Sequence, residues 1–139
     1  MNPTKTQTDA APASQADIDA ITQAILDYAE SGYSGEADRR ARALHPALAK
    51  RTITPHPRTG RDMVTPMSVS EAIENVRAVQ FQAEKLPRDQ WRVDITVLDV
   101  FKNVATAKSL SREWLDYIHL VKVDGEWKII NVLWQRYDA

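Results

Sequence analysis

The chain has 139 residues, of which 43% are hydrophobic and 27% charged, which is enough for one compact domain and too few for two. Lys and Arg number 18 and Asp and Glu number 19, so the net charge of -1 supplies no positive field that would hold a nucleic acid or an acidic membrane. The absence of cysteine excludes a disulfide scaffold, a thiolate metal site and a cysteine nucleophile.

The beginning of the chain differs in composition from the rest. Residues 1–15 are mostly Thr, Ala, Pro, Gln and Ser, too weakly apolar to offset the entropy of ordering them, so we expect a disordered tail before a single domain over residues 16–139. No apolar run approaches the roughly 18 residues of a membrane span. Residues 1–17 also lack the apolar stretch of a secretory signal, so we expect a cytoplasmic protein with no membrane partner.

The first predicted helix begins at Ser14, which has an acidic residue, Asp17, three positions further on, as in an N-cap. Apolar residues then recur at intervals of three and four, the spacing of one helix face: Ile18, Ile21, Ile25 and Tyr28. The helix should end near Ser31, because Gly32 and Gly35 supply the left-handed backbone that terminates helices.

Two further helices are predicted before residue 90. The second carries its apolar face on Ala37, Ala41 and Leu44, and Pro46 prevents its continuation. A short strand over residues 50–54 follows, and an irregular loop is indicated by the prolines between residues 55 and 66. Residues 68–71 form a capping box, which predicts a third helix to about Glu84.

The residues after position 90 have the period of two that is typical of strands with one buried face. We expect strands over residues 91–101, 104–110, 113–123 and 126–135, with turns at Asn103 and at Asp124–Gly125. All four tryptophans lie in this part, so the sheet carries the large aromatic surface and the helices must cover one of its faces. The sequence therefore predicts an α+β fold, with helices first and an antiparallel meander after them.

The order of these elements and several short motifs resemble a known family. The motifs are Tyr28 to Gly35, Leu44-His45-Pro46 with Lys50-Arg51, Trp114-x-Asp116-Tyr117-x-His119-Leu120 and Asp124-Gly125-x-Trp127-Lys128-Ile129-Ile130-Asn131. Together they resemble the putative lumazine-binding proteins, a branch of the nuclear transport factor 2-like superfamily that also includes ketosteroid isomerases. The resemblance implies a cystatin-like cone, in which three helices pack in the concave side of a curved antiparallel sheet around a pocket, and a homodimer formed through the sheets.

The side that each strand residue faces depends on the turn at Asp124–Gly125. We prefer a type I turn with a bulge at Gly125, which pairs Tyr117 with Asn131 and places Tyr117, His119 and Asn131 on one face. This register aligns one apolar strip that carries a few polar groups, as in ligand pockets: Leu115, Val121, Trp127 and Leu133. The alternative for this polar cluster is a dimer interface.

A two-residue turn would instead pair Ile118 with Asn131 and Asp116 with Leu133, so that Tyr117 and His119 would point away. The site would then move to Asp116 and Trp114. In the preferred register, Tyr28 on the buried stripe of the first helix forms the opposite wall. Lys50 and Arg51 are expected to be solvated at a strand edge, with the alternative that they hold an anionic ligand at the rim.

The three histidines, His45, His56 and His119, lack the spacing of a metal site, so we expect no metal and no cofactor. His45 is interpreted as a helix C-terminal residue, with the alternative that it joins the ligand site. The carboxylate expected of an isomerase base is missing from residues 50–57.

Two functions from different classes fit these residues. The first is a small-molecule-binding protein whose ligand contacts are Tyr28, His45, Tyr117, His119 and Asn131. The second is an isomerase- or dehydratase-like enzyme in which His119 or His45 takes a proton and Tyr28 or Tyr117 stabilises the resulting enolate. A homodimer is expected in both cases, because apolar residues lie on both faces of the later strands and one layer of helices covers only one face.

Overall fold

The computed structural model describes residues 13–137, which form three α-helices, one 3-10 helix and a six-stranded sheet. The helices are α1 (Gln15–Ser34), α2 (Ala37–Ala43) and α3 (Val69–Val79), with η1 at Arg88–Gln90. The strands are β1 (Leu44–Pro55), β2 (Asp62–Met67), β3 (Val93–Phe101), β4 (Val104–Ser111), β5 (Trp114–Val123) and β6 (Glu126–Arg136). The first twelve positions of the predicted tail lie outside the described residues.

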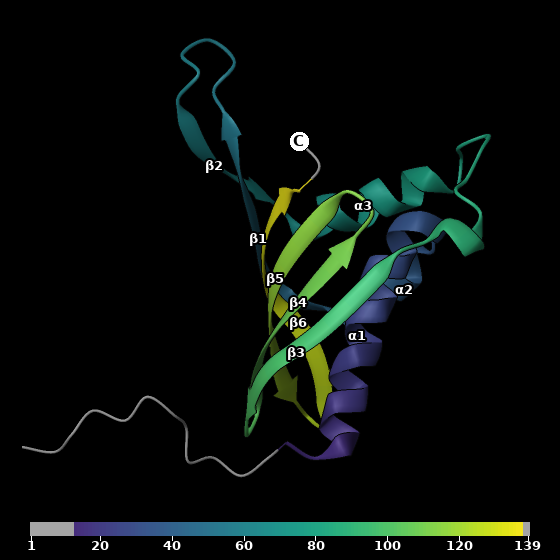
Figure 1. Ribbon diagram of the computed structural model, residues 1–139, viewed down its shortest axis with the longest axis vertical. Coiled ribbons are helices and arrows are strands. Elements are labelled where there is room, and N and C mark those ends of the chain that lie inside the picture. Colours follow the sequence, from purple (N-terminus) through teal and green to yellow (C-terminus); the bar gives the residue numbers. More distant parts are fainter. Residues whose placement is uncertain (1–12, 138–139) are drawn as a thin grey trace, which may run out of the picture.

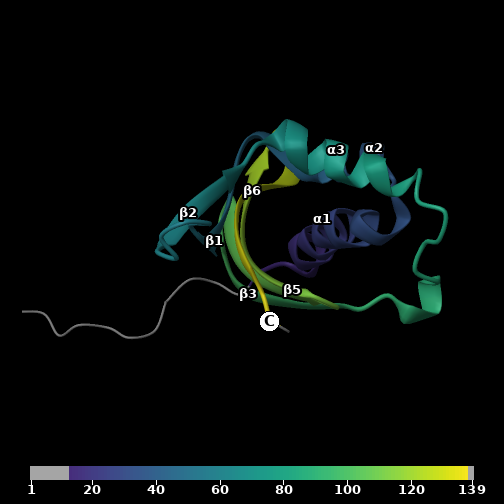
Figure 2. The ribbon, with the colours of Figure 1, turned by 90° about the horizontal axis from the view of Figure 1, so that it is seen from above.

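The sheet is strongly curved and open, and all three helices lie on its concave side (Figures 1 and 2). Helix α1 runs inside the curve, and α2 and α3 close one side of it. The predicted α+β architecture of helices packed on a curved sheet is therefore confirmed.

Helix α1 forms where its caps and apolar stripe predict. The Ser14 hydroxyl accepts from the Asp17 N–H at 3.1 Å, and the stripe residues Ile21, Ile25 and Tyr28 are buried. The helix continues past the predicted end to Ser34, because Gly35, at φ 80°, is the left-handed residue that terminates it. A side chain at Gly35 would also approach the backbone N of Gln80 within 2.7 Å, so the close packing of α1 against the end of α3 requires glycine there.

The other two helices differ from the predictions in one important detail each. In α2 the buried positions are Ala37, Arg40 and Ala43, whereas Ala41 of the predicted stripe is exposed. Helix α3 has the predicted capping box between Ser68 and Glu71, but it ends at Val79, short of the expected Glu84. The consequence for the site is that the Arg40 side chain of α2 lies in the interior of the protein.

The strands run in the order β2-β1-β6-β5-β4-β3, and the predicted antiparallel meander of β3 to β6 is confirmed. Two predictions about the preceding segment were wrong. Strand β1 starts at Leu44 and pairs in parallel with β6, so it is much longer than residues 50–54. Residues 62–67 form β2, which pairs with β1 in a hairpin that projects from the sheet (Figure 1), because Pro66 takes an edge position where its missing N–H costs no ladder bond.

The pairing of β5 with β6 combines parts of both registers that the sequence allowed. The turn at Asp124–Gly125 has two residues, since Val123 pairs with Glu126, and the bulge lies further on, where His119 pairs with Asn131 and Leu120 with Ile129. Tyr117, His119 and Asn131 therefore share a face, as preferred, but Tyr117 pairs with Leu133 and not with Asn131. The predicted apolar strip is wrong, because Trp127 is buried under α1 whereas Leu133 is 54% exposed.

Candidate functional site

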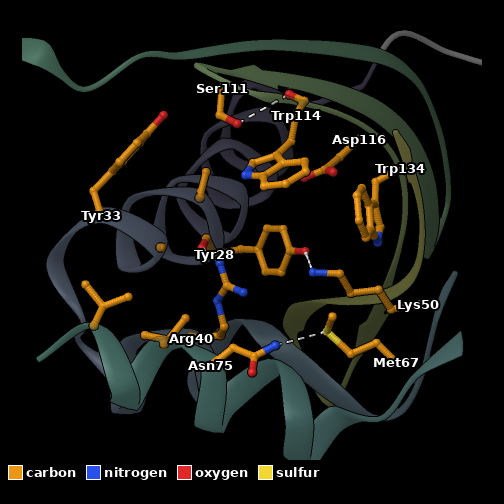
Figure 3. A pocket seen from close by; sticks show the side chains of 14 residues that line it. Tyr28, Tyr33, Arg40, Lys50, Met67, Asn75, Ser111, Trp114, Asp116 and Trp134 are labelled. Atoms are coloured by element: carbon orange, nitrogen blue, oxygen red, sulfur yellow. Dashed lines mark hydrogen bonds between the residues drawn. The ribbon is translucent and has the colours of Figure 1, made fainter. Parts of the chain in front are cut away.

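A cavity of about 380 Å³ lies between the helices and the concave face of the sheet. Helices α1, α2 and α3 form one side of it, and strands β1, β5 and β6 form the other. Figure 3 shows Tyr28 from α1 in its centre, facing Lys50 of β1 and the indoles of Trp114 and Trp134. Asp17, in the first turn of α1, joins the start of this helix to the sheet. Its carboxylate accepts from Trp127 Nε1 at 3.0 Å and from Lys122 Nζ at 3.1 Å.

Two cations reach this cavity from adjacent elements. Arg40 of α2 is 9% exposed and is held by Ser31 Oγ at 3.0 Å and the Tyr28 carbonyl oxygen at 2.8 Å, with its guanidinium 4.3 Å from the Tyr28 ring centre. Lys50 is also 9% exposed, and its Nζ donates to the Tyr28 hydroxyl at 2.7 Å. Lys50 occupies this position because Leu48, Lys50 and Thr52 alternate toward the interior on β1.

One carboxylate, Asp116 of β5, faces the two cations. Its neighbours across the sheet are Ser109 on β4 and Trp134 on β6, so three polar side chains form a row on the concave face. Within residues 13–137, the Asp116 carboxylate forms no hydrogen bond or ion pair, and the buried Ser109 Oγ and Trp134 Nε1 have no partner either. Buried polar groups are normally paired, so Asp116 and Trp134, the two members of the row that line the cavity, have unused capacity to bind polar atoms of a ligand.

Burial dominates the protonation of these groups. It raises the pKa of Asp116 to about 6, although Lys50 and Arg40 act in the opposite direction. It lowers the pKa of Lys50 to about 8, with help from the positive charge of Arg40. The Tyr28 pKa is raised above its usual value by burial and by Asp116, so the phenol is neutral and its proton remains available as a donor.

Aromatic rings form the remaining walls. Trp114 and Trp134 meet edge to face with centroids 5.1 Å apart, and Trp114 is 36% exposed at the mouth. Tyr33 stacks on Trp91 at 5.5 Å, and its hydroxyl donates to the Arg92 carbonyl oxygen and accepts from the Arg112 N–H. The arrangement offers flat apolar faces beside a net positive group of charges, which suits a planar ligand bearing a negatively charged or carbonyl oxygen.

Of the five residues predicted as ligand contacts, only one lines this cavity. Tyr28 lines it, whereas Tyr117, His119 and Asn131 lie on the convex face of the sheet, where Asn131 Nδ2 and His119 Nδ1 are 3.2 Å apart. His45 is the second residue of β1 and not a helix C-terminal residue, and its Nδ1 accepts from the Ala47 N–H at 2.9 Å outside the cavity. The alternative pair, Asp116 and Trp114, does line the cavity.

Sequence reasoning missed the two buried cations. Arg51 is solvated as expected, but Lys50 is not. Its alternation with Leu48 and Thr52 was the available signal, and a strand begun at Leu44 would have made it visible. Arg40 had a weaker signal, its spacing of three from Ala37 and Ala43, which a search for apolar stripes passes over.

Residues 13–137 contain no group of three or more His, Asp or Glu residues that could hold a metal ion. In the same part of the chain, no helix is long and apolar enough to cross a membrane.

Comparisons with known proteins agree with the geometry. The sequence profile of a family described as putative lumazine-binding matches residues 16–135. No curated protein matches the sequence.

Solved structures of the nuclear transport factor 2-like type share the fold. A protein of unknown function from Shewanella baltica has a TM-score of 0.69 and 12% identity, over 93% of this chain and 100% of that chain. Another from Methylobacillus flagellatus has a TM-score of 0.68 and 20% identity, over 92% of this chain and 98% of its own. A putative dehydratase from Streptomyces avermitilis has a TM-score of 0.62 and 11% identity, over 91% and 100%. The fold expected from the sequence is confirmed.

Proposed function

The chain belongs to the putative lumazine-binding family, and from this premise we propose that its cavity binds a planar small molecule carrying a negatively charged or carbonyl oxygen. The observation that carries the proposal is the pair of buried cations, Lys50 and Arg40, beside indole faces and one carboxylate without a hydrogen-bond partner among the described residues.

The size and charge of the cavity support this ligand class. A volume of about 380 Å³ falls within the roughly 300–1,000 Å³ of small-molecule sites. Two cations against one carboxylate leave a net positive charge that an anionic oxygen would neutralise. Tyr28 and Trp134 add a neutral hydroxyl and an indole N–H, which fix the orientation of such an oxygen.

Fluorescence titration with matched probes tests the proposal. We expect 2-naphthoate and lumazine to quench the cavity tryptophans saturably, and 2-naphthalenemethanol, which lacks the charge, to bind at least tenfold more weakly. Lys50→Met should lower naphthoate affinity at least tenfold, whereas Arg51→Met, on the solvent-facing side of β1, should leave it unchanged. Equal binding of the charged and neutral probes would contradict the role given to the cations.

A second candidate function is proton transfer by Asp116. The observation that favours it is a carboxyl whose pKa of about 6 lets it hold or release a proton near neutral pH, beside a neutral tyrosine hydroxyl. This differs from the predicted use of His119 or His45. Exchange of solvent deuterium into a bound ketone that is lost in Asp116→Asn but not in His119→Ala would support catalysis. Ketone binding without exchange would contradict it and leave ligand binding as the proposed function.

Homodimer formation through the convex face is also proposed. Phe101, Val104, Tyr117 and Leu133 are each about half-exposed there, and the hollow that contains His119 and Asn131 lies among them. Apolar surface of this kind is typical of an interface. Light scattering tests the proposal: we expect the wild type to be a dimer and Leu133→Lys to be a monomer. The cytoplasmic location stays a prediction.

A further inference from the structure

We propose that Lys50 is a nucleophile that forms an imine with a carbonyl-bearing ligand of this cavity. The inference rests on the proposed function, because it requires that small molecules enter the cavity. It goes further by naming a covalent chemistry and a substrate class, aldehydes and ketones attached to a planar group.

The position of Lys50 supports this chemistry. The side chain comes from a strand interior, is almost completely buried, and ends in the cavity 5.1 Å from the centre of the Tyr28 ring and 5.9 Å from that of Trp134. Its one hydrogen bond among the described residues goes to the Tyr28 hydroxyl, a neutral group, and it has no carboxylate within ion-pair distance there. A lysine held only to stabilise the fold would be expected to have a charged partner.

Burial favours the neutral amine of Lys50, so its pKa lies closer to neutrality than that of a solvated lysine. The titratable and charged groups that face it are Tyr28 of α1, Arg40 of α2 and Asp116 of β5. Arg40 repels a second positive charge and lowers the pKa further, whereas Asp116 acts in the opposite direction and does not cancel the shift. Desolvation and a neighbouring cation are the two means by which proteins activate lysine toward carbonyl compounds.

The reaction balances with groups present in the cavity. The lone pair of the neutral Lys50 nitrogen attacks the carbonyl carbon, a C–N bond forms, and the carbonyl oxygen takes up the proton released by nitrogen. The resulting hydroxyl then leaves as water, with a proton from the acid form of Asp116 and the second nitrogen proton passing back to the carboxylate. The products are the imine and one water, and no oxidant or reductant is needed.

Other lysines provide an internal comparison. Lys108 and Lys102 are exposed on β4 and the turn before it, whereas Lys122 is bound to Asp17 and Lys128 to the Arg42 carbonyl. Within residues 13–137, Lys50 is the lysine that lines the cavity. Selective reaction at this position therefore cannot come from general exposure.

Reductive trapping tests the proposal. The full chain is incubated with 2-naphthaldehyde and cyanoborohydride at a series of pH values on both sides of 8, digested, and the naphthylmethyl adduct is located by mass spectrometry. We expect the Lys50 peptide to be labelled at least tenfold faster than the Lys108 peptide at pH 7, and its labelling rate to have a pH midpoint near 8. Excess 2-naphthoate should slow the reaction at Lys50 alone, and Arg51→Met should be labelled as the wild type is.

The possible failures are distinguishable. If 2-naphthoate binds but the adduct is spread over the exposed lysines, the imine is excluded and the proposed binding function stands. If neither probe binds, both proposals fail. Lys50→Arg keeps the positive charge and removes the nucleophilic amine. If this variant binds 2-naphthoate but forms no adduct, anion binding and imine formation are separate properties of Lys50. If the adduct forms undiminished in this variant, the assignment to Lys50 is wrong.

Discussion

The two faces of strands β5 and β6 carry different kinds of polar residue. On the concave face Asp116 and Trp134 stand side by side with polar atoms that have no partner among the described residues, and Lys50 lies next to them on β1. On the convex face His119 and Asn131 are exposed and contact each other. Polar groups that are both buried and unpaired are costly, so the concave face is the one shaped for a ligand.

The first prediction concerns the packing that supports the concave face. Ile118 is fully buried between Asp116 and Leu120, so Ile118→Ala should lower the free energy of unfolding by about 3 to 4 kcal/mol through lost burial and a cavity. Urea denaturation measures the change. The adjacent Tyr117→Ala, on the exposed face, is the control and should cost less than about 1 kcal/mol in the monomer. Equal losses would remove the contrast between the faces.

The second prediction uses the pKa of Asp116. Because it is raised from 3.8 to about 6, the folded chain holds a proton that the unfolded chain has released between these pH values. The contribution of this group to stability is therefore lost as the pH rises from about 4 to about 6, by about 2 to 3 kcal/mol. Asp116→Asn should remove that loss, so the variant is more stable than the wild type at pH 7 and similar to it below pH 4.

Thermal unfolding across this pH range checks the result. Asp62→Asn, at an exposed position on β2, is the matched control and should leave the pH profile unchanged. A profile for Asp116→Asn that still falls between pH 4 and 6 would assign the titration to another group.

The sequence predicts the fold well because its signals are local. Caps at Ser14 and Ser68 and the alternation after residue 90 specify helices and strands without reference to other segments. The face of the sheet on which each strand residue lies depends less on local sequence. It depends on strand pairing, and a bulge in the pairing of β5 with β6, between His119 and Leu120, shifts the register by one residue. Three of the predicted ligand contacts were placed on the concave side for this reason and lie on the convex side.

The missed cations have a related cause. Lys50 and Arg40 are buried by contacts that join β1, α1 and α2, and these contacts depend on the parallel pairing of β1 with β6. Composition and periodicity favour a solvated position for any lysine or arginine. Only the tertiary structure shows that the two side chains meet around Tyr28.

The third prediction concerns the indole wall of the site. Trp134→Leu should weaken 2-naphthoate binding about tenfold, because it removes a flat ring and the indole N–H that has no partner among the described residues. Isothermal titration calorimetry measures the affinity. Leu133→Ala is the control on the other face of β6, with a 54% exposed side chain, and should bind as the wild type does. A similar loss in both variants would indicate a general effect on the sheet.

The smallest effect on stability and on ligand binding is expected at His119, which is predicted from the sequence as a ligand contact and lies on the convex face. His119→Ala removes an exposed ring and its contact with Asn131, so the free energy of unfolding should fall by less than about 0.5 kcal/mol. Affinity for 2-naphthoate should stay within twofold of the wild type, because the ring is separated from the cavity by the sheet. Since the hollow around His119 belongs to the proposed dimer surface, sedimentation velocity should detect a weaker dimer. A tenfold loss of naphthoate affinity with an unchanged dimer would place the ligand on the convex face instead.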